Sequence, residues 1–167
     1  MSQLPELKWI AEARKHIGLK EIKGSRHNPI ILSWLKKLKA WWNDDESAWC
    51  GLYVAYCLQE ANVPTPKHWY RALDYLSYGT RLVKPAYGCV AVKARQGGGH
   101  VCFVVGKTMD GKLVCLGGNQ NDMVCFALYN EADFEAFIWY GLTDSPAQHR
   151  YKLPVLTEVN LTKTTEA

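Results

Sequence analysis

The order of the hydrophobic patterns along the chain constrains its fold more than any other feature. Apolar residues of the first half recur at helical spacings, whereas after Arg81 the chain consists of short β-type runs separated by glycine. Five such runs stand at residues 88–93, 100–106, 112–117, 123–128 and 137–141. Met109-Asp110-Gly111 has the residues of a hairpin turn between two of them. Helices followed by consecutive strands predict an α+β domain with an antiparallel sheet.

Three helices are predicted before the strands. The first covers residues 7–17 and ends at Gly18, and the third covers residues 48–61 behind an acidic, helix-capping segment at 43–47. The second covers residues 30–42 and is a cationic amphipath, with an apolar stripe and a lysine-bearing side. We expect this 30–42 helix to dock on the core, or alternatively to contact an anionic membrane or envelope. Residues 67–79 are a further helix candidate.

The composition is that of one globular domain. The chain has 167 residues, of which 48% are apolar, enough for a core without disulfide or metal support. Its net charge of +4 does not predict nucleic-acid binding. We place a catalytic domain at residues 1–144 and a polar tail at residues 145–167. The sequence contains no membrane-spanning run and begins with no secretory leader, so we expect synthesis in the cytoplasm.

One cysteine and one histidine stand out as candidates for chemistry. The six cysteines form no C-x-x-C pair, so we expect reduced thiols that mostly fill the core. Cys50 differs because it lies in the first turn of the predicted third helix, where unpaired amide groups and the helix dipole favour a thiolate. His100 follows three glycines and opens a strand, a position from which an imidazole can serve as a general base. For both residues the alternative is burial in the core.

A third polar residue is expected to orient the imidazole. The strand predicted beside His100 ends in Leu116-Gly-Gly-Asn119-Gln120-Asn121. The side-chain carbonyl of Asn119 can accept from one ring N–H and leave the other nitrogen for the thiol. Gln120 and Asn121 are the rival candidates for this role.

Four groups of residues give the chain a family resemblance. They are Gly18-Leu-Lys-Glu-Ile-Lys-Gly24 with His27-Asn28-Pro29-Ile30, Glu46-Ser-Ala-Trp-Cys50-Gly, Gly99-His100-Val101 with Val104-Val105-Gly106, and Leu116-Gly-Gly-Asn119-Gln120. In this order they resemble the CHAP-type cysteine amidases and endopeptidases of the NlpC-like, papain-like superfamily, which cut bacterial peptidoglycan. The resemblance implies a papain-like fold with N-terminal helices packed on a small antiparallel sheet. It also implies Cys50 as nucleophile, His100 as base and Asn119 as third member.

The expected site is completed by substrate contacts and needs no metal. We expect Trp49, Gly99 and Gln120 to bind the substrate. The chain departs from the family pattern at Cys89 and at the glycine pair 117–118, where relatives usually have acidic residues. Residues 44–46 are acidic, but we interpret them as a helix start and not as a calcium site. We predict no metal and no cofactor.

The resulting hypothesis is a peptidoglycan hydrolase of the phage endolysin type. It would act as a monomer on the cell wall in the periplasm or envelope and would cleave an amide bond by a Cys-His-Asn thiolate mechanism. One alternative is an interbacterial toxin amidase paired with an immunity protein. A second is a non-catalytic wall-binding module that grips glycan through exposed tryptophans among Trp41, Trp42, Trp49 and Trp69. A third is membrane disruption by the cationic helix.

Overall fold

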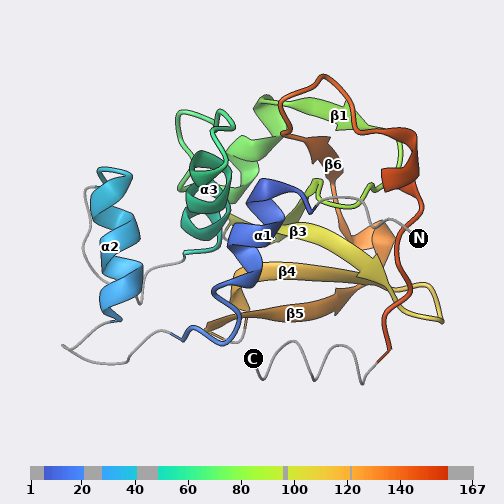
Figure 1. Ribbon diagram of the computed structural model, residues 1–167, viewed down its shortest axis with the longest axis horizontal. Coiled ribbons are helices and arrows are strands. Elements are labelled where there is room, and N and C mark those ends of the chain that lie inside the picture. The colour runs from blue at the N-terminus through green and yellow to red at the C-terminus, as the bar shows by residue number, and fades with distance from the viewer. Residues whose placement is uncertain (1–5, 21–27, 41–48, 96–97, 121, 158–167) are drawn as a thin grey trace.

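In the part of the chain that the structure describes, the fold is a six-stranded antiparallel sheet with three α-helices, which confirms the predicted α+β class. The computed structural model describes residues 6–20, 28–40, 49–95, 98–120 and 122–157. The strand order is β1-β6-β2-β3-β4-β5, and every named strand pair is antiparallel. The helices α1 and α3 lie over the sheet, and α2 lies on the outer side of α3 (Figure 1).

The five predicted strands are all present, and a sixth was missed. The strands are β1 (Thr80–Leu82), β2 (Val90–Arg95), β3 (Gly98–Lys107), β4 (Leu113–Gln120), β5 (Met123–Tyr129) and β6 (Ala136–Trp139). The predicted turn joins β3 to β4, with Gly111 at a φ of 91° that favours glycine. The missed strand β1 has three residues, too few to show a period of two.

The helices occur where they were predicted but are shorter. They are α1 (Lys8–Arg14), α2 (Pro29–Lys37) and α3 (Cys50–Glu60). Asn28 begins α2 by accepting a hydrogen bond from the Ile30 backbone N–H at 2.8 Å, with Pro29 in the first turn. The predicted 30–42 helix ends early because Lys39 takes a left-handed φ of 59°. Trp41 and Trp42 lie outside the described residues, and the 67–79 candidate contains a 3₁₀ helix, η1 (Ala72–Ser77).

The core lies between α1, α3 and the sheet. Tyr53 of α3 is fully buried, and its hydroxyl donates to the Ala13 carbonyl of α1 at 2.7 Å. The ring of Tyr53 also lies edge-on to Phe103 of β3, with 6.3 Å between centroids. Because neighbouring strand residues point to opposite faces, this contact places Phe103 on the helix side of the sheet. One side chain thus ties two helices to a central strand.

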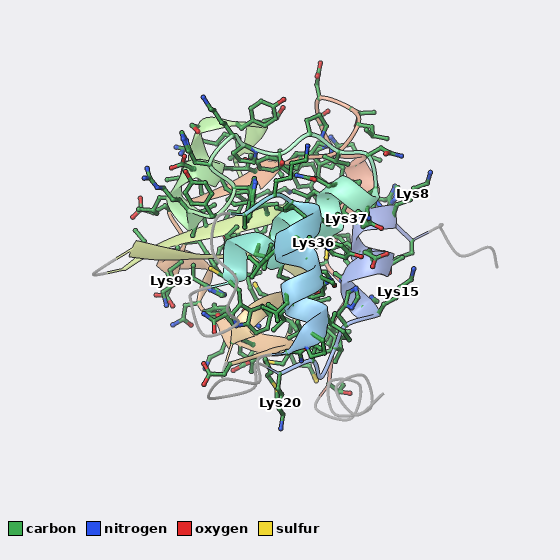
Figure 2. All side chains as sticks on the ribbon, turned by 90° about the vertical axis from the view of Figure 1, so that its left-hand side faces the viewer. Lys8, Lys15, Lys20, Lys36, Lys37 and Lys93 are labelled. Carbon is green, nitrogen blue, oxygen red and sulfur yellow. The ribbon has the colours of Figure 1, made fainter. Side chains whose placement is uncertain are left out.

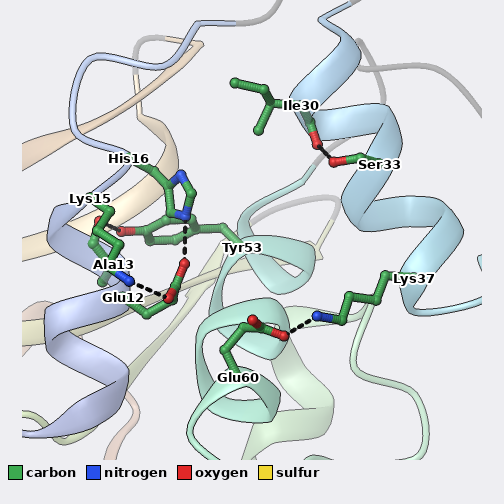
Figure 3. A network of polar contacts seen from close by, with 9 residues as sticks. All are labelled: Glu12, Ala13, Lys15, His16, Ile30, Ser33, Lys37, Tyr53 and Glu60. Atoms are coloured by element: carbon green, nitrogen blue, oxygen red, sulfur yellow. Dashed lines mark hydrogen bonds and ion pairs between the residues drawn. The ribbon is translucent and has the colours of Figure 1, made fainter.

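The second helix is held by aromatic packing. Trp34 of α2 stacks on Tyr56 of α3 at 5.0 Å, and His16, which follows α1, lies edge-on to Trp34 at 4.9 Å. Figure 3 shows the polar contacts around this junction, in which His16 pairs with Glu12 and Lys37 pairs with Glu60. The buried residues of α2 are Ile31, Trp34 and Leu35. The described part of the amphipathic helix therefore docks on the core.

The segment predicted as a polar tail is packed on the sheet as far as residue 156. The Lys107 backbone N–H donates to the Pro154 carbonyl at 2.9 Å, and the Leu156 N–H donates to the Lys107 carbonyl at 2.8 Å. Before this contact lies a short 3₁₀ helix, η3 (Gln148–Tyr151). The domain boundary placed at residue 144 therefore does not mark the end of the packed chain, and residues 158–167 lie outside the described part.

Across the described ranges, the structure contains no helix that is both long and apolar enough to cross a membrane.

Candidate functional site

Cys50 is the first residue of α3. Cys50 is buried, with 6% of its surface exposed, and the Tyr53 N–H donates to the Trp49 carbonyl as the helix starts. The N-terminal amides of an eleven-residue helix point toward this end, so the local field favours a negative charge on the sulfur. The predicted capping residues Asp45 and Ser47 lie outside the described residues. The position expected for the nucleophile is therefore present.

The imidazole of His100 is held by Gln120. His100 lies on β3 with 3% of its surface exposed, and its Nε2 lies 3.0 Å from the Gln120 Oε1. The Gln120 amide is itself fixed, because its Nε2 donates to the Cys125 carbonyl at 2.6 Å. Its Oε1 also accepts from the Tyr129 hydroxyl at 3.0 Å. An amide oxygen accepts only, so the proton of neutral His100 resides on Nε2.

The second ring nitrogen of His100 is in a different environment from the first. Nδ1 is buried and has no hydrogen-bond partner among the residues the structure describes. Since Nε2 carries the proton, Nδ1 holds a lone pair and can accept a proton. An imidazole with one nitrogen anchored and the other left as a base has the tautomer that a cysteine–histidine pair requires.

The residue that contacts the imidazole of His100 is Gln120 and not Asn119. The register of β4 against β5 shifts between Gly117 and Gln120, and Asn119 adopts a left-handed φ of 58°. Such an irregularity inserts a residue into the ladder and changes which side chain faces the neighbouring strand. The structure thus brings the rival Gln120, which was also expected to bind substrate, to His100 in the place expected for Asn119. The other rival, Asn121, lies outside the described residues.

Two neighbouring glycines of β4 leave room for Trp49, which precedes α3, and for the Gln120 amide that holds His100. A Cβ on Gly118 would lie 2.8 Å from the Trp49 ring, and a Cβ on Gly117 would lie 2.8 Å from the Gln120 Oε1. Neighbouring strand residues face opposite ways, so Trp49 and the Gln120 amide meet β4 on its two faces. No hydrogen bond joins His100 to Cys50 in this structure, since Nε2 bonds Gln120 and Nδ1 has no partner in the described part.

Two of the predicted substrate contacts have packing roles instead. Trp49 is 1% exposed and covers Gly118, so its ring is not available to a substrate. A Cβ on Gly99 would lie 2.9 Å from the Leu73 side chain, so Leu73 already fills the space beside this glycine. Trp69 is also buried, at 9% exposure, which removes two of the four tryptophans suggested for a glycan-gripping surface. The sequence signal failed here because tryptophans look alike whether they are exposed or buried.

The cysteines around the site stay protonated. Burial raises the pKa of Cys57 and of Cys102 well above the usual range, and it raises the pKa of Cys89 to about 12. Burial is the largest effect on the pKa of Cys102 and outweighs the contact with His100, which lowers it. None of the six cysteines forms a disulfide. These three thiols therefore serve as core residues, as expected.

Comparison with known proteins adds no relative. No family model matches the chain, and no curated protein or solved structure shows a significant similarity to it. Sequence reasoning missed Tyr129, which shares the Gln120 oxygen with His100. In the sequence, the only signal for Tyr129 is that it directly follows the predicted strand run 123–128. Its contact with Gln120 depends on how β4 and β5 are aligned, which the sequence does not show.

Proposed function

We propose that the protein is a papain-like cysteine hydrolase that cleaves an amide bond of bacterial peptidoglycan. The observation that carries the proposal is the state of His100, whose Nε2 is anchored by Gln120 and whose Nδ1 remains as a buried base. Cys50 at the start of α3 supplies the nucleophile. The resemblance of the motifs around these residues to CHAP-type enzymes supplies the substrate class.

The reaction uses thiol and imidazole in turn. His100 Nδ1 accepts the proton of the Cys50 thiol, and the sulfur attacks the amide carbonyl carbon. The Cys50 backbone N–H donates to the oxyanion of the tetrahedral intermediate. The amine then leaves with the proton from Nδ1, which forms a thioester. A water molecule attacks the thioester and gives a proton to Nδ1, and the sulfur leaves as a thiol once it regains that proton, releasing the carboxylic acid.

The proposal requires contact between Sγ and Nδ1 during turnover. Catalytic hydrogen bonds are often unmade or long without substrate and tighten when substrate binds. Phe103 of β3 faces the helices, so the alternation of side chains along the strand puts His100 on the face of the sheet away from α3. Contact between Sγ and Nδ1 therefore demands that the glycine-containing start of β3 turn over when substrate binds, and an imidazole that stays on the far face with substrate bound would contradict the proposal.

The lysines on α1 and α2 suit an anionic envelope. Figure 2 labels Lys36 and Lys37 on α2, Lys8 on α1 and Lys15 directly after α1. All four side chains are exposed. Attraction between these lysines and anionic wall polymers would raise the local concentration of the enzyme at its substrate, an effect that salt weakens. We propose that the protein acts there as a monomeric endolysin.

Wall digestion by a cysteine variant tests the proposal. We expect the protein to release new amino groups from purified peptidoglycan and Cys50→Ala to release none above background. Cys57→Ala is the matched control, because Cys57 lies on the same helix as a buried thiol and should keep the activity. The proposal is wrong if the wild-type protein binds walls without cleaving them, or if Cys50→Ala cleaves as well as wild type.

A further inference from the structure

A hollow at one edge of the sheet has the features of a ligand site. It lies where β1 begins and β6 ends and has a volume of about 260 Å³. Pockets for drug-sized ligands are larger, roughly 300–1,000 Å³, so this hollow suits one small ring. The residues used below, which all line it, are Tyr78, Thr80, Trp139, Tyr140, Gly141 and Asp144.

A buried donor without an acceptor lies at this hollow. Trp139 is only 5% exposed, and its Nε1 has no hydrogen-bond partner among the described residues. The nitrogen lies beneath Gly141, where a Cβ would come within 2.5 Å of it. A buried N–H left unpaired costs about 1–3 kcal/mol. Because Gly141 covers the nitrogen, a ligand oxygen accepts from this N–H only when Gly141 shifts aside, and the new hydrogen bond then recovers that cost.

The remaining walls offer an aromatic surface and oxygen acceptors. Tyr78 is 48% exposed and lies 6.0 Å from the ring of Tyr140, so one ring presents its surface to the hollow. The Tyr140 hydroxyl is already used, since it donates to the Tyr75 carbonyl at 2.7 Å. Thr80 and Asp144 are exposed at the rim. The carboxylate disfavours an anionic ligand, and the indole N–H disfavours a cation.

We propose that this hollow binds an acetamido sugar. The acetamido carbonyl accepts from Trp139 Nε1, the sugar ring packs on Tyr78, and a hydroxyl donates to the Asp144 carboxylate. A neutral ring of this kind meets the donor, the acceptor and the aromatic surface together. The inference rests on the proposed function only for the source of the sugar, which would be a glycan strand of the wall.

The hollow is connected to the start of α3 through two tyrosines. Tyr140 donates to the Tyr75 carbonyl, and the Tyr75 hydroxyl donates to the Gly51 carbonyl at 2.8 Å. Tyr75 is fully buried, and burial raises its pKa well above the usual value, so the hydroxyl stays a donor. A sugar held in the hollow would therefore be positioned relative to Cys50 by rigid, hydrogen-bonded side chains.

Titration with disaccharides tests the inference on the full chain. We would follow the indole N–H resonances of nitrogen-labelled tryptophan and assign the Trp139 signal with Trp139→Phe. The Trp139 signal should move with N,N′-diacetylchitobiose, and cellobiose, which lacks the acetamido carbonyl, should bind roughly fivefold more weakly. Asp144→Asn should weaken binding by a similar factor. Asp110→Asn, on the β3–β4 turn, is the matched control and should bind as wild type does.

Three results would overturn the inference. They are a Trp139 signal that stays in place, equal affinity for the two disaccharides, and a preference for tetramethylammonium over both. Cys50→Ala should bind N,N′-diacetylchitobiose unchanged, because the thiol does not touch the hollow. Sugar binding and wall cleavage are thus measured separately, and a failure of one is distinguishable from a failure of the other.

Discussion

At the scale of single residues, the proposed chemistry depends on the state of the His100 imidazole. The Gln120 amide is fixed by the Cys125 carbonyl, so its oxygen faces His100 and sets the ring tautomer. From the sequence we predicted His100 as the base and Asn119 as the residue that orients it, with Gln120 as a rival candidate. The choice between Asn119 and Gln120 could not be predicted, because a register shift between β4 and β5 decides which of these two adjacent side chains turns toward His100.

Removal of the anchoring amide should impair catalysis. In Gln120→Ala the proton of His100 can shift to Nδ1, and the ring loses its fixed orientation. Since a positioned general base contributes about 10²–10⁴-fold to rate, we expect kcat for wall cleavage to fall by roughly 10²-fold. The measurement is amino-group release under saturating substrate, accompanied by the rate of Cys50 alkylation by iodoacetamide as a function of pH.

Asn119→Ala provides the comparison for this variant. Its side chain is half-buried on the same strand, and it should keep activity within a few-fold of wild type. If Asn119→Ala lost as much activity as Gln120→Ala, the assignment of the orienting residue to Gln120 would be wrong.

At the scale of elements, the spacing of hydrophobic residues predicted the positions of the strands more accurately than the ends of the helices. The runs 100–106 and 123–128 lie within β3 and β5, because glycines and turn residues bound them on both sides. The helical pattern at 30–42 continued past the true end of α2. Only the left-handed backbone of Lys39 stops that helix, and a lysine carries no sequence signal for such a backbone.

The contact between α3 and β4 should be sensitive to a single methyl group. A Cβ on Gly118 would lie 2.7 Å from the Tyr53 Cβ, so Gly118→Ala forces the helix away from the strand. Overpacking of this kind costs about 1–3 kcal/mol in the free energy of unfolding. Chemical denaturation should show that loss, and wall cleavage should fall because the helix start moves.

Gly111→Ala is the control in an open turn. A Cβ there meets nothing within 4 Å, so only the positive φ opposes the change, at about 1 kcal/mol. Activity should be retained. Equal losses of activity in the two variants would contradict a specific role for the α3–β4 contact.

At the scale of the whole molecule, buried thiols should make the fold sensitive to alkali. The Cys89 thiol keeps its proton up to a pKa of about 12 in the folded state, whereas an unfolded chain releases it near pH 8.5. Between these values the unfolded state binds fewer protons, so stability falls as pH rises. Each such thiol contributes a slope of about 1.4 kcal/mol per pH unit.

Denaturant unfolding at pH 8 and pH 10 would measure this effect. We expect the free energy of unfolding to be lower at the higher pH and the decrease to be smaller in Cys89→Ala. The burial-raised pKa values of Cys57 and Cys102 act in the same direction. A decrease that did not change in Cys89→Ala would show that this thiol is not the source.

The docking of the C-terminal segment on β3 has a consequence for association between molecules. Beyond Val104, β3 has no partner in β2, and the segment around Pro154 and Leu156 satisfies both backbone groups of Lys107. It fits there because Gly106 has no side chain to meet Leu156. An exposed strand edge is a template for joining the sheet of a neighbouring molecule. Residues 154–156 thus cover a strand edge at which copies of the protein could otherwise aggregate.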